Sequence, residues 1–284
     1  MCVSPIYLRK GVGNGYNVGR YVPCGHCLDC LKKRQNEWYV RFWCEERYQK
    51  RINPNSITIF LTLTYDETSL PQSREAALND FRAFIKKISR RQGNKRVRFY
   101  AVTENGTLRG RLHWHVLLFG FDPSVISKPL NKYFDEVWKK GFNSAEYCTP
   151  RVFTYVSKYV TKDLDTLKQD DSWKTISVCS KRPSLGIMFF SVAKWRNYLH
   201  NTQDFRIMID GYAYSLPRYF REKLLSELDL FFSKTKTSIV TFPSDEEREM
   251  EHVKRNNINK IYGFKKTVNK LRREKASGFV QKPL

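Results

Sequence analysis

Two histidines separated by one residue stand in an apolar stretch, RLHWHVLLFG, at residues 111–120. In a β-strand, residues i and i+2 point to one face, so His113 and His115 should project together while Trp114 packs on the other side. Two neighbouring imidazoles can bind one divalent ion. Glu104, at the end of the preceding predicted strand, should lie opposite them and supply a carboxylate, a set that suits Mg²⁺ or Mn²⁺. The alternative interpretation is that the histidines are ordinary polar residues on a sheet face.

Two tyrosines follow at helical spacing in TYVSKYVTKD, residues 154–163. On a helix, Tyr155, Lys158, Tyr159 and Lys162 share one face. Two lysines on that stripe argue against a core face, because burial of an ammonium group is costly. A phenol has an ordinary pKa of ~10, so it attacks a phosphate at neutral pH only with help from a lysine or a metal ion. The alternative interpretation is that both tyrosines pack in the core.

Three cysteines, Cys24, Cys27 and Cys30, are spaced like ligands of one metal centre. A ferredoxin-type cluster would need a further cysteine where the chain has Arg34, so structural zinc is the better interpretation. Candidates for the fourth ligand are Cys2, His26 and Cys44. The alternative is a tight loop of reduced thiols. Arg34 and the lysines beside it are interpreted as contacts to a DNA backbone.

The charge of the chain predicts an anionic polymer as partner. Its 284 residues include 51 Lys and Arg against 28 Asp and Glu, a net charge of +23, which indicates nucleic acid binding. The chain has seven cysteines, an odd number that argues against a disulfide framework. No run approaches about 20 apolar residues, and the N-terminus lacks the apolar segment of a secretory signal. These features predict an intracellular protein.

The predicted elements are typical of an α+β fold. We expect strands at 57–65, 97–103 and 111–119, and helices at 31–50, 75–91, near 128–140 and near 151–163. The core order of strand, helix, strand, strand, helix fits a ferredoxin-like antiparallel sheet with helices on one face. A hairpin is expected at 205–216, turning at Asp210-Gly211, with a helix starting at Pro217.

We therefore divide the chain into four parts. They are a Cys-rich N-terminal segment and helix (1–50), a nuclease core (51–165), an additional α+β part of the same domain (166–244) and a basic, charged helical tail (245–284).

Several segments, which together span roughly residues 20–190, resemble the HUH endonucleases, named for histidine, hydrophobic residue, histidine. More narrowly, they are similar to the rolling-circle replication initiators of microviruses, small single-stranded DNA phages, and above all to the gokushovirus type. The segments are PCGHCLDCLKKRQNEWYVR, FLTLTYDE, LHWHVLLFG, YVSKYVTK and SKRPSLGIMFF. Their combination and order are far more specific than the HxH motif alone.

The resemblance implies a metal-dependent tyrosine DNA endonuclease. His113 and His115 match the family's metal-binding histidines, Glu104 the acid that completes the site, and Tyr155 and Tyr159 the tyrosines that attack DNA. The implied reaction nicks the viral origin, forms a covalent 5′-phosphotyrosine link and later rejoins the displaced strand. Implied partners are origin DNA, host polymerase and a host helicase, in the host bacterial cytoplasm. The alternative is a non-catalytic single-stranded nucleic-acid-binding protein of ferredoxin-like fold.

Overall fold

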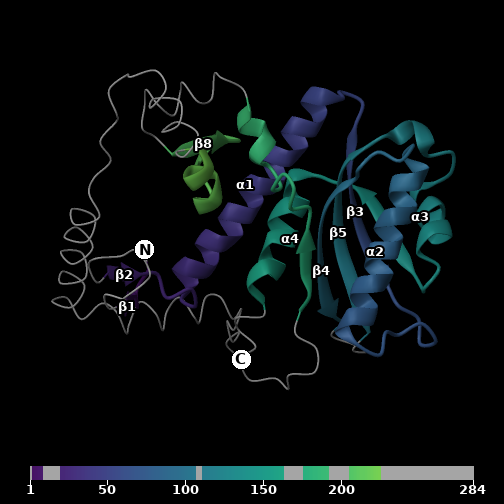
Figure 1. Ribbon diagram of the computed structural model, residues 1–284, viewed down its shortest axis with the longest axis horizontal. Helices are drawn as coiled ribbons and strands as arrows, with labels where there is room; N and C mark the ends of the chain where they lie inside the picture. The colour runs from purple at the N-terminus through teal and green to yellow at the C-terminus, as the bar shows by residue number, and fades with distance from the viewer. Residues whose placement is uncertain (1, 9–19, 107–110, 163–174, 192–204, 225–284) are drawn as a thin grey trace, which may run out of the picture. The chain divides into compact units, whose positions relative to one another are not determined.

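The structure is a computed structural model that describes residues 2–8, 20–106, 111–162, 175–191 and 205–224 (Figure 1). The chain divides into two compact units, Met1–Arg34 with Asp229–Leu284, and Gln35–Leu228. The predicted charged tail at 245–284 lies outside the described residues. None of the described helices is long and apolar enough to cross a membrane.

A five-stranded antiparallel sheet forms the centre of the larger unit. Its order is β6-β3-β5-β4-β7, with β3 at Ile57–Thr64, β4 at Arg98–Asn105, β5 at Leu112–Phe121, β6 at Asn143–Tyr147 and β7 at Ser177–Cys179. Helices α2 (Arg74–Arg91) and α3 (Leu130–Trp138) complete the sequence order β3-α2-β4-β5-α3-β6. This order is the ferredoxin-like one, so the predicted α+β fold is confirmed. Strands β6 and β7 were not predicted.

Helices cover both faces of this sheet, so the expectation of helices on one face was wrong (Figure 1). Helices α2 and α3 pack on the face that carries Trp114. Helix α1 (Leu28–Ile52) contributes Phe42, and α4 (Pro150–Lys162) contributes Phe153, to a second cluster around Phe119 on the other face. The physical reason lies in β5, which is apolar on both faces and needs two covers.

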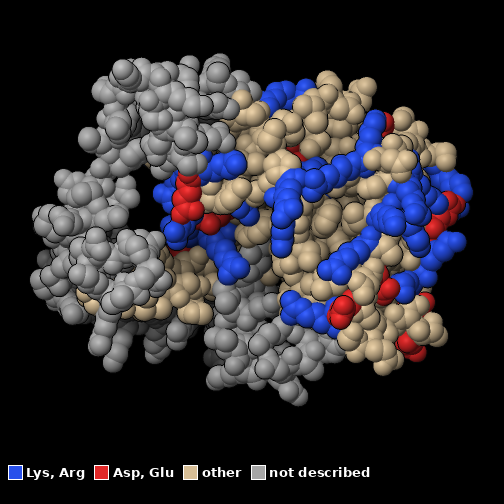
Figure 2. Space-filling model, viewed as in Figure 1, with Lys and Arg blue, Asp and Glu red and all other residues tan. Residues whose placement is uncertain are grey.

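Helix α2 illustrates how the sequence sets these elements. The Ser73 side chain caps its N-terminus by accepting a hydrogen bond from the Ala76 N–H at 3.1 Å. Phe81 lies on its buried face and stacks on Trp114, with 4.6 Å between ring centroids. The opposite face of its second half is basic, and Figure 2 shows Lys and Arg side chains running across the surface that carries α2 and α3.

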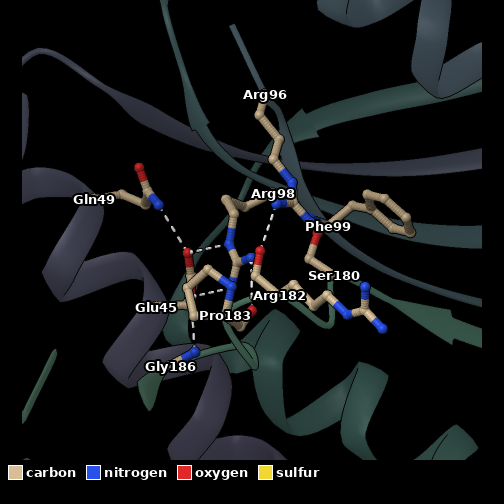
Figure 3. Close-up of polar contacts among 9 residues, drawn as sticks. All are labelled: Glu45, Gln49, Arg96, Arg98, Phe99, Ser180, Arg182, Pro183 and Gly186. Atoms are coloured by element: carbon tan, nitrogen blue, oxygen red, sulfur yellow. Dashed lines mark hydrogen bonds and ion pairs between the residues drawn. The ribbon is translucent and has the colours of Figure 1, made fainter. Parts of the chain in front are cut away.

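A buried ion pair joins α1 to the sheet. Glu45 on α1 faces Arg98 on β4, with Nε···Oε1 and Nη2···Oε2 distances of 3.0 and 3.3 Å (Figure 3). Gln49 Nε2 and the Gly186 N–H also donate to the carboxylate, at 2.7 Å each, and Arg98 Nη1 donates to the Pro183 carbonyl at 2.9 Å. Burial of two charges requires such complete pairing. The network fixes the segment around 183–186 against α1 and β4.

Two hairpins complete the described chain. Strands β8 (Arg206–Ile209) and β9 (Tyr212–Ser215) pair around Asp210-Gly211, both in the left-handed region, which confirms the predicted hairpin. Residues 218–224 are helical, as expected after Pro217. In the smaller unit, β1 (Ile6–Leu8) pairs with β2 (Arg20–Val22).

Candidate functional site

The two histidines project from β5 toward hydroxyl groups on the neighbouring strand β3. The register places His115 opposite Thr62 and His113 opposite Thr64. Each imidazole Nδ1 lies 3.2 Å from the Oγ1 atom of its threonine. These contacts fix the planes of both rings. The sequence analysis missed both threonines, although the Thr-Leu-Thr alternation in FLTLTYDE has the same parity as the histidines.

Glu104 completes a polar chain through His115. Its strand position on β4 is opposite His113, but its carboxylate Oε2 lies 3.1 Å from His115 Nε2. A threonine hydroxyl can donate or accept, so Thr62 can satisfy Nδ1 whether Nε2 carries a proton or a lone pair. A metal-binding histidine needs this kind of partner on its second nitrogen. The structure therefore places Glu104 beside the histidine pair, as predicted.

The His113 ring is pressed against the turn that follows β4. A Cβ atom on Gly106 would collide with His113 Nε2, so this position accepts only glycine without displacing the ring. The Gly106 N–H donates to the Arg111 carbonyl at 2.9 Å and closes the hairpin. Burial lowers the pKa of His113, an effect that Glu104 partly opposes. The imidazole is therefore neutral at pH 7, the state that ligates metals.

Both tyrosines of α4 meet His115. The Tyr159 ring stacks on the His115 ring at a centroid distance of 4.7 Å, and the Tyr155 ring stands edge-on at 6.0 Å. The Tyr159 hydroxyl donates to the Tyr155 hydroxyl. Tyr155 is 43% exposed, whereas Tyr159 is half-buried. The sequence expected these phenols and imidazoles to gather at one place, and the described geometry brings them together.

Burial, the hydrogen bond with Tyr155 and the charge of Glu104 together raise the pKa of Tyr159. This phenol therefore keeps its proton in the metal-free site. The groups beside it would have to change their charge before it could attack a phosphate.

The two lysines of the predicted stripe are placed less completely. Lys158 is exposed on α4, on the turn between the two tyrosines. Lys162 is the last residue of α4, and its side chain lies outside the described part of the structure. Their proposed help to the tyrosines remains a prediction. The apolar face of α4 is formed by Phe153 and Val156, which are fully buried.

Phe60 on β3 is a further residue that the sequence analysis missed. Its ring lies parallel to the His115 ring at 5.9 Å and edge-on to Tyr155 at 6.0 Å. Together with Tyr159 it surrounds the imidazole with aromatic surface. Such surroundings exclude water and strengthen charge interactions inside the site.

The histidines and Glu104 are close but do not converge on one point in this structure. The His113 and His115 ring centroids are 6.4 Å apart. Among the described residues, these three do not form a group whose ligand atoms all lie within 4.8 Å of one another. A rotation of the His113 side chain would be needed for all three to bind a single ion. The His115 Nε2 and Glu104 Oε2 atoms already have a spacing suited to adjacent ligands of a small divalent ion.

The cysteine cluster does converge, and it includes Cys2. The ligand atoms of Cys2, Cys24, Cys27 and Cys30 all lie within 4.8 Å of one another, so the cluster could bind a metal ion such as zinc. Of the three candidates for the fourth position, His26 is outside this group and Cys44 is buried in a hydrophobic cluster of the larger unit. Burial raises the pKa of Cys27, but backbone and thiol hydrogen bonds outweigh it and lower the pKa to about 7.

Comparison with known proteins identifies the family of the core. Residues 58–164 match the family model of the phage replication-associated protein ORF2. Replication-associated protein ORF4 of Chlamydia phage 1 is 30% identical over 230 residues, 72% of this chain and 55% of that protein. ORF2 of Spiroplasma virus 4 is 23% identical over 77% of this chain and 72% of that protein, and VP4 of Bdellovibrio phage phiMH2K is 27% identical over 70% and 66%.

No solved structure matches the chain. The match spans only about half the length of the Chlamydia phage protein. The matched core contains both histidines, Glu104 and both tyrosines. The resemblance to phage replication proteins is confirmed, and through residues 58–164 the chain belongs to the replication-associated protein ORF2 family.

Proposed function

We propose that this protein initiates rolling-circle replication of a single-stranded DNA phage by nicking one strand of the viral origin. The observation that supports this most strongly is the meeting of Tyr155 and Tyr159 with His115 and Glu104 at one end of the sheet. A protein that only binds DNA has no need for two phenols beside a histidine and a carboxylate. Membership of a replication-associated family supports the same reaction.

In the proposed reaction, a tyrosine Oη attacks a phosphodiester of the origin. A bond forms between Oη and phosphorus, and the bond from phosphorus to the 3′-oxygen breaks. The phenolic proton is lost and the 3′-oxygen gains one, so the products are a 3′-hydroxyl and a 5′-phosphotyrosine. The 3′-hydroxyl then serves as the primer for host polymerase.

We assign a Mg²⁺ or Mn²⁺ ion to His113, His115 and Glu104. Such an ion would supply positive charge to the scissile phosphate and to the attacking oxygen. The donor set of two imidazoles and a carboxylate fits this ion class. The threonine hydroxyls fit it too, because Thr62 and Thr64 can hold both imidazoles by Nδ1 while Nε2 remains available as a ligand.

The second tyrosine gives the site a way to end a replication round. Both hydroxyls are within hydrogen-bonding reach of each other, so either phenol can occupy nearly the same position. One tyrosine would hold the 5′ end while the other cuts the regenerated origin. The released 3′-hydroxyl would then attack the first phosphotyrosine and close the displaced strand.

Origin DNA would be bound largely through distributed positive charge. Exposed basic residues lie on α4 near the tyrosines, namely Arg151 and Lys158, and on the outer face of α2 (Figure 2). Phosphate contacts of this kind are independent of sequence and weaken as salt is added. We propose that a host helicase separates the strands.

The test is to mix the full chain with a labelled single-stranded origin oligonucleotide and Mn²⁺, and to look for a protein–DNA adduct that survives SDS. We expect the adduct with the wild type and, as an order of magnitude, roughly a 1,000-fold loss or more in the Tyr155→Phe, Tyr159→Phe double variant, because phenylalanine has no nucleophilic oxygen. An adduct that persists in the double variant would remove the tyrosine assignment. Retained binding with no adduct from the wild type would favour the non-catalytic alternative.

A further inference from the structure

Four cysteine sulfurs that the proposed nicking reaction does not use meet near the N-terminus. Cys2 precedes β1, Cys24 follows β2, and Cys27 and Cys30 lie just before and within the first turn of α1. All four are free thiols. Cys2 is 22 residues away from Cys24 in sequence, so the fold, and not local spacing, brings it to the other three.

The separations of these sulfurs fit one four-coordinate ion. The Sγ atoms of Cys2 and Cys24 are 3.6 Å apart, and those of Cys24 and Cys30, and of Cys27 and Cys2, are 4.0 Å apart. Zinc bound to four thiolates at about 2.3 Å sets sulfurs roughly 3.8 Å apart at the corners of a tetrahedron. Disulfide sulfurs would be about 2.05 Å apart. We propose that these four cysteines bind one structural zinc ion.

The backbone around the cluster supports bound thiolates. The Cys24 N–H donates to Cys2 Sγ at 3.3 Å, and the Cys27 N–H donates to Cys24 Sγ at 3.4 Å. Such contacts orient ligand sulfurs and stabilise their negative charge. Gly25, between the first two cysteines of the loop, has a φ of +78°, which glycine adopts without strain. This turn lets both Cys24 and Cys27 face the same point.

The strands beside the cluster need a support other than a hydrophobic core. Ile6, Tyr7 and Leu8 make up β1, and all three side chains are exposed. An isolated two-stranded hairpin is marginally stable in water. A metal that is bound only in the folded state stabilises its domain by its binding free energy. The zinc ion would thereby hold Cys2 and the hairpin to the start of α1.

The ligand set also indicates which ion is bound. Four thiolates in tetrahedral arrangement select zinc or iron. A cluster of several irons and sulfides would occupy the space between its cysteines and spread them apart, whereas these ligand atoms lie within 4.8 Å of one another. A single zinc ion fits that spacing.

The first test measures metal content of the full chain by mass spectrometry after gel filtration in metal-free buffer. We expect about one zinc per chain, and Cys2→Ser should lower zinc affinity by roughly tenfold or more in competition with a chromogenic chelator. Cys148→Ser is the matched control, because Cys148 lies outside the cluster. His113→Ala should also retain zinc, which separates this site from the proposed catalytic ion.

The second test replaces zinc with Co²⁺, whose visible spectrum reports the number of thiolate ligands. The wild type should give a tetrathiolate spectrum, and Cys2→His should still bind the ion with a shifted spectrum, even if Cys2→Ser fails to fold. Zinc below about 0.1 per chain, stoichiometric iron, or an unchanged cobalt spectrum in Cys2→His would overturn the proposal. A disulfide between any two of the four cysteines in freshly purified protein would overturn it as well.

Discussion

Two acid–base pairs lie at opposite ends of β4, on the same face of the sheet. Arg98 near the start of the strand pairs with Glu45, and Glu104 near its end pairs with His115. Six residues of strand separate the two, roughly 20 Å. The first pair is sealed, with Glu45 only 1% exposed, whereas the Glu104 side chain is 15% exposed.

The two pairs differ in the partners that surround them. The Glu45 carboxylate accepts hydrogen bonds from an arginine, an amide side chain and a backbone N–H, groups that can only donate. His115 is held by the Thr62 hydroxyl and lies against two phenols, groups that can donate or accept. Fixed donors make the first pair a structural link. Reversible partners allow the second pair to exchange a proton or a metal ion.

The largest effect on stability should come from breaking the structural pair. Arg98→Met removes the charge that offsets Glu45, and loss of one partner of a buried pair costs about 3–5 kcal/mol. Urea unfolding followed by circular dichroism measures this change. Glu104→Gln is the comparison variant and should change the unfolding free energy by about 1 kcal/mol or less. Equal losses in the two variants would contradict the distinction between the pairs.

The next effect concerns the reactive end. His113→Ala removes a proposed metal ligand and should reduce adduct formation in Mn²⁺ by roughly 100-fold or more, because the ion would be lost from the phosphate. DNA affinity should change by less than about threefold, since distributed charge supplies most of it. Adduct yield and fluorescence anisotropy with the same oligonucleotide give the two readouts. Parallel losses in both would show that His113 serves binding.

The smallest effect should come from the hydroxyl that holds His115. Thr62→Val keeps the shape of the side chain but removes its hydrogen bond to Nδ1. Loss of such an outer partner typically costs roughly 10–100-fold in metal affinity or activity, so we expect about a tenfold higher Mn²⁺ requirement for adduct formation. Thr58→Val is a matched control on the same strand. An unchanged Mn²⁺ dependence in Thr62→Val would mean that the threonine does not orient the ligand.

Much of this arrangement was predictable from local pattern. The parity of His113 and His115 and the helical spacing of Tyr155 and Tyr159 are properties of short segments, and the structure keeps them. Strand β6 was missed because NSAEY has no apolar run and is held by pairing with β3. Such pairing depends on the fold as a whole.

The partners of the key residues were also hidden. Glu45 and Arg98 are 53 residues apart, and in the sequence both resemble ordinary surface charges. Thr62 became a partner of His115 only through the register between β3 and β5. Cys2 could be one of several fourth ligands until the hairpin brought its sulfur to the cluster.

The central claim is that a tyrosine of α4 becomes covalently linked to DNA, and peptide mapping tests it most directly. Trypsin cleaves after Arg151, Lys158 and Lys162, so Tyr155 falls in VFTYVSK and Tyr159 in YVTK. After the adduct is digested with nuclease and trypsin, mass spectrometry should find a nucleotide on one of these two peptides. A nucleotide found only on another peptide would contradict the account.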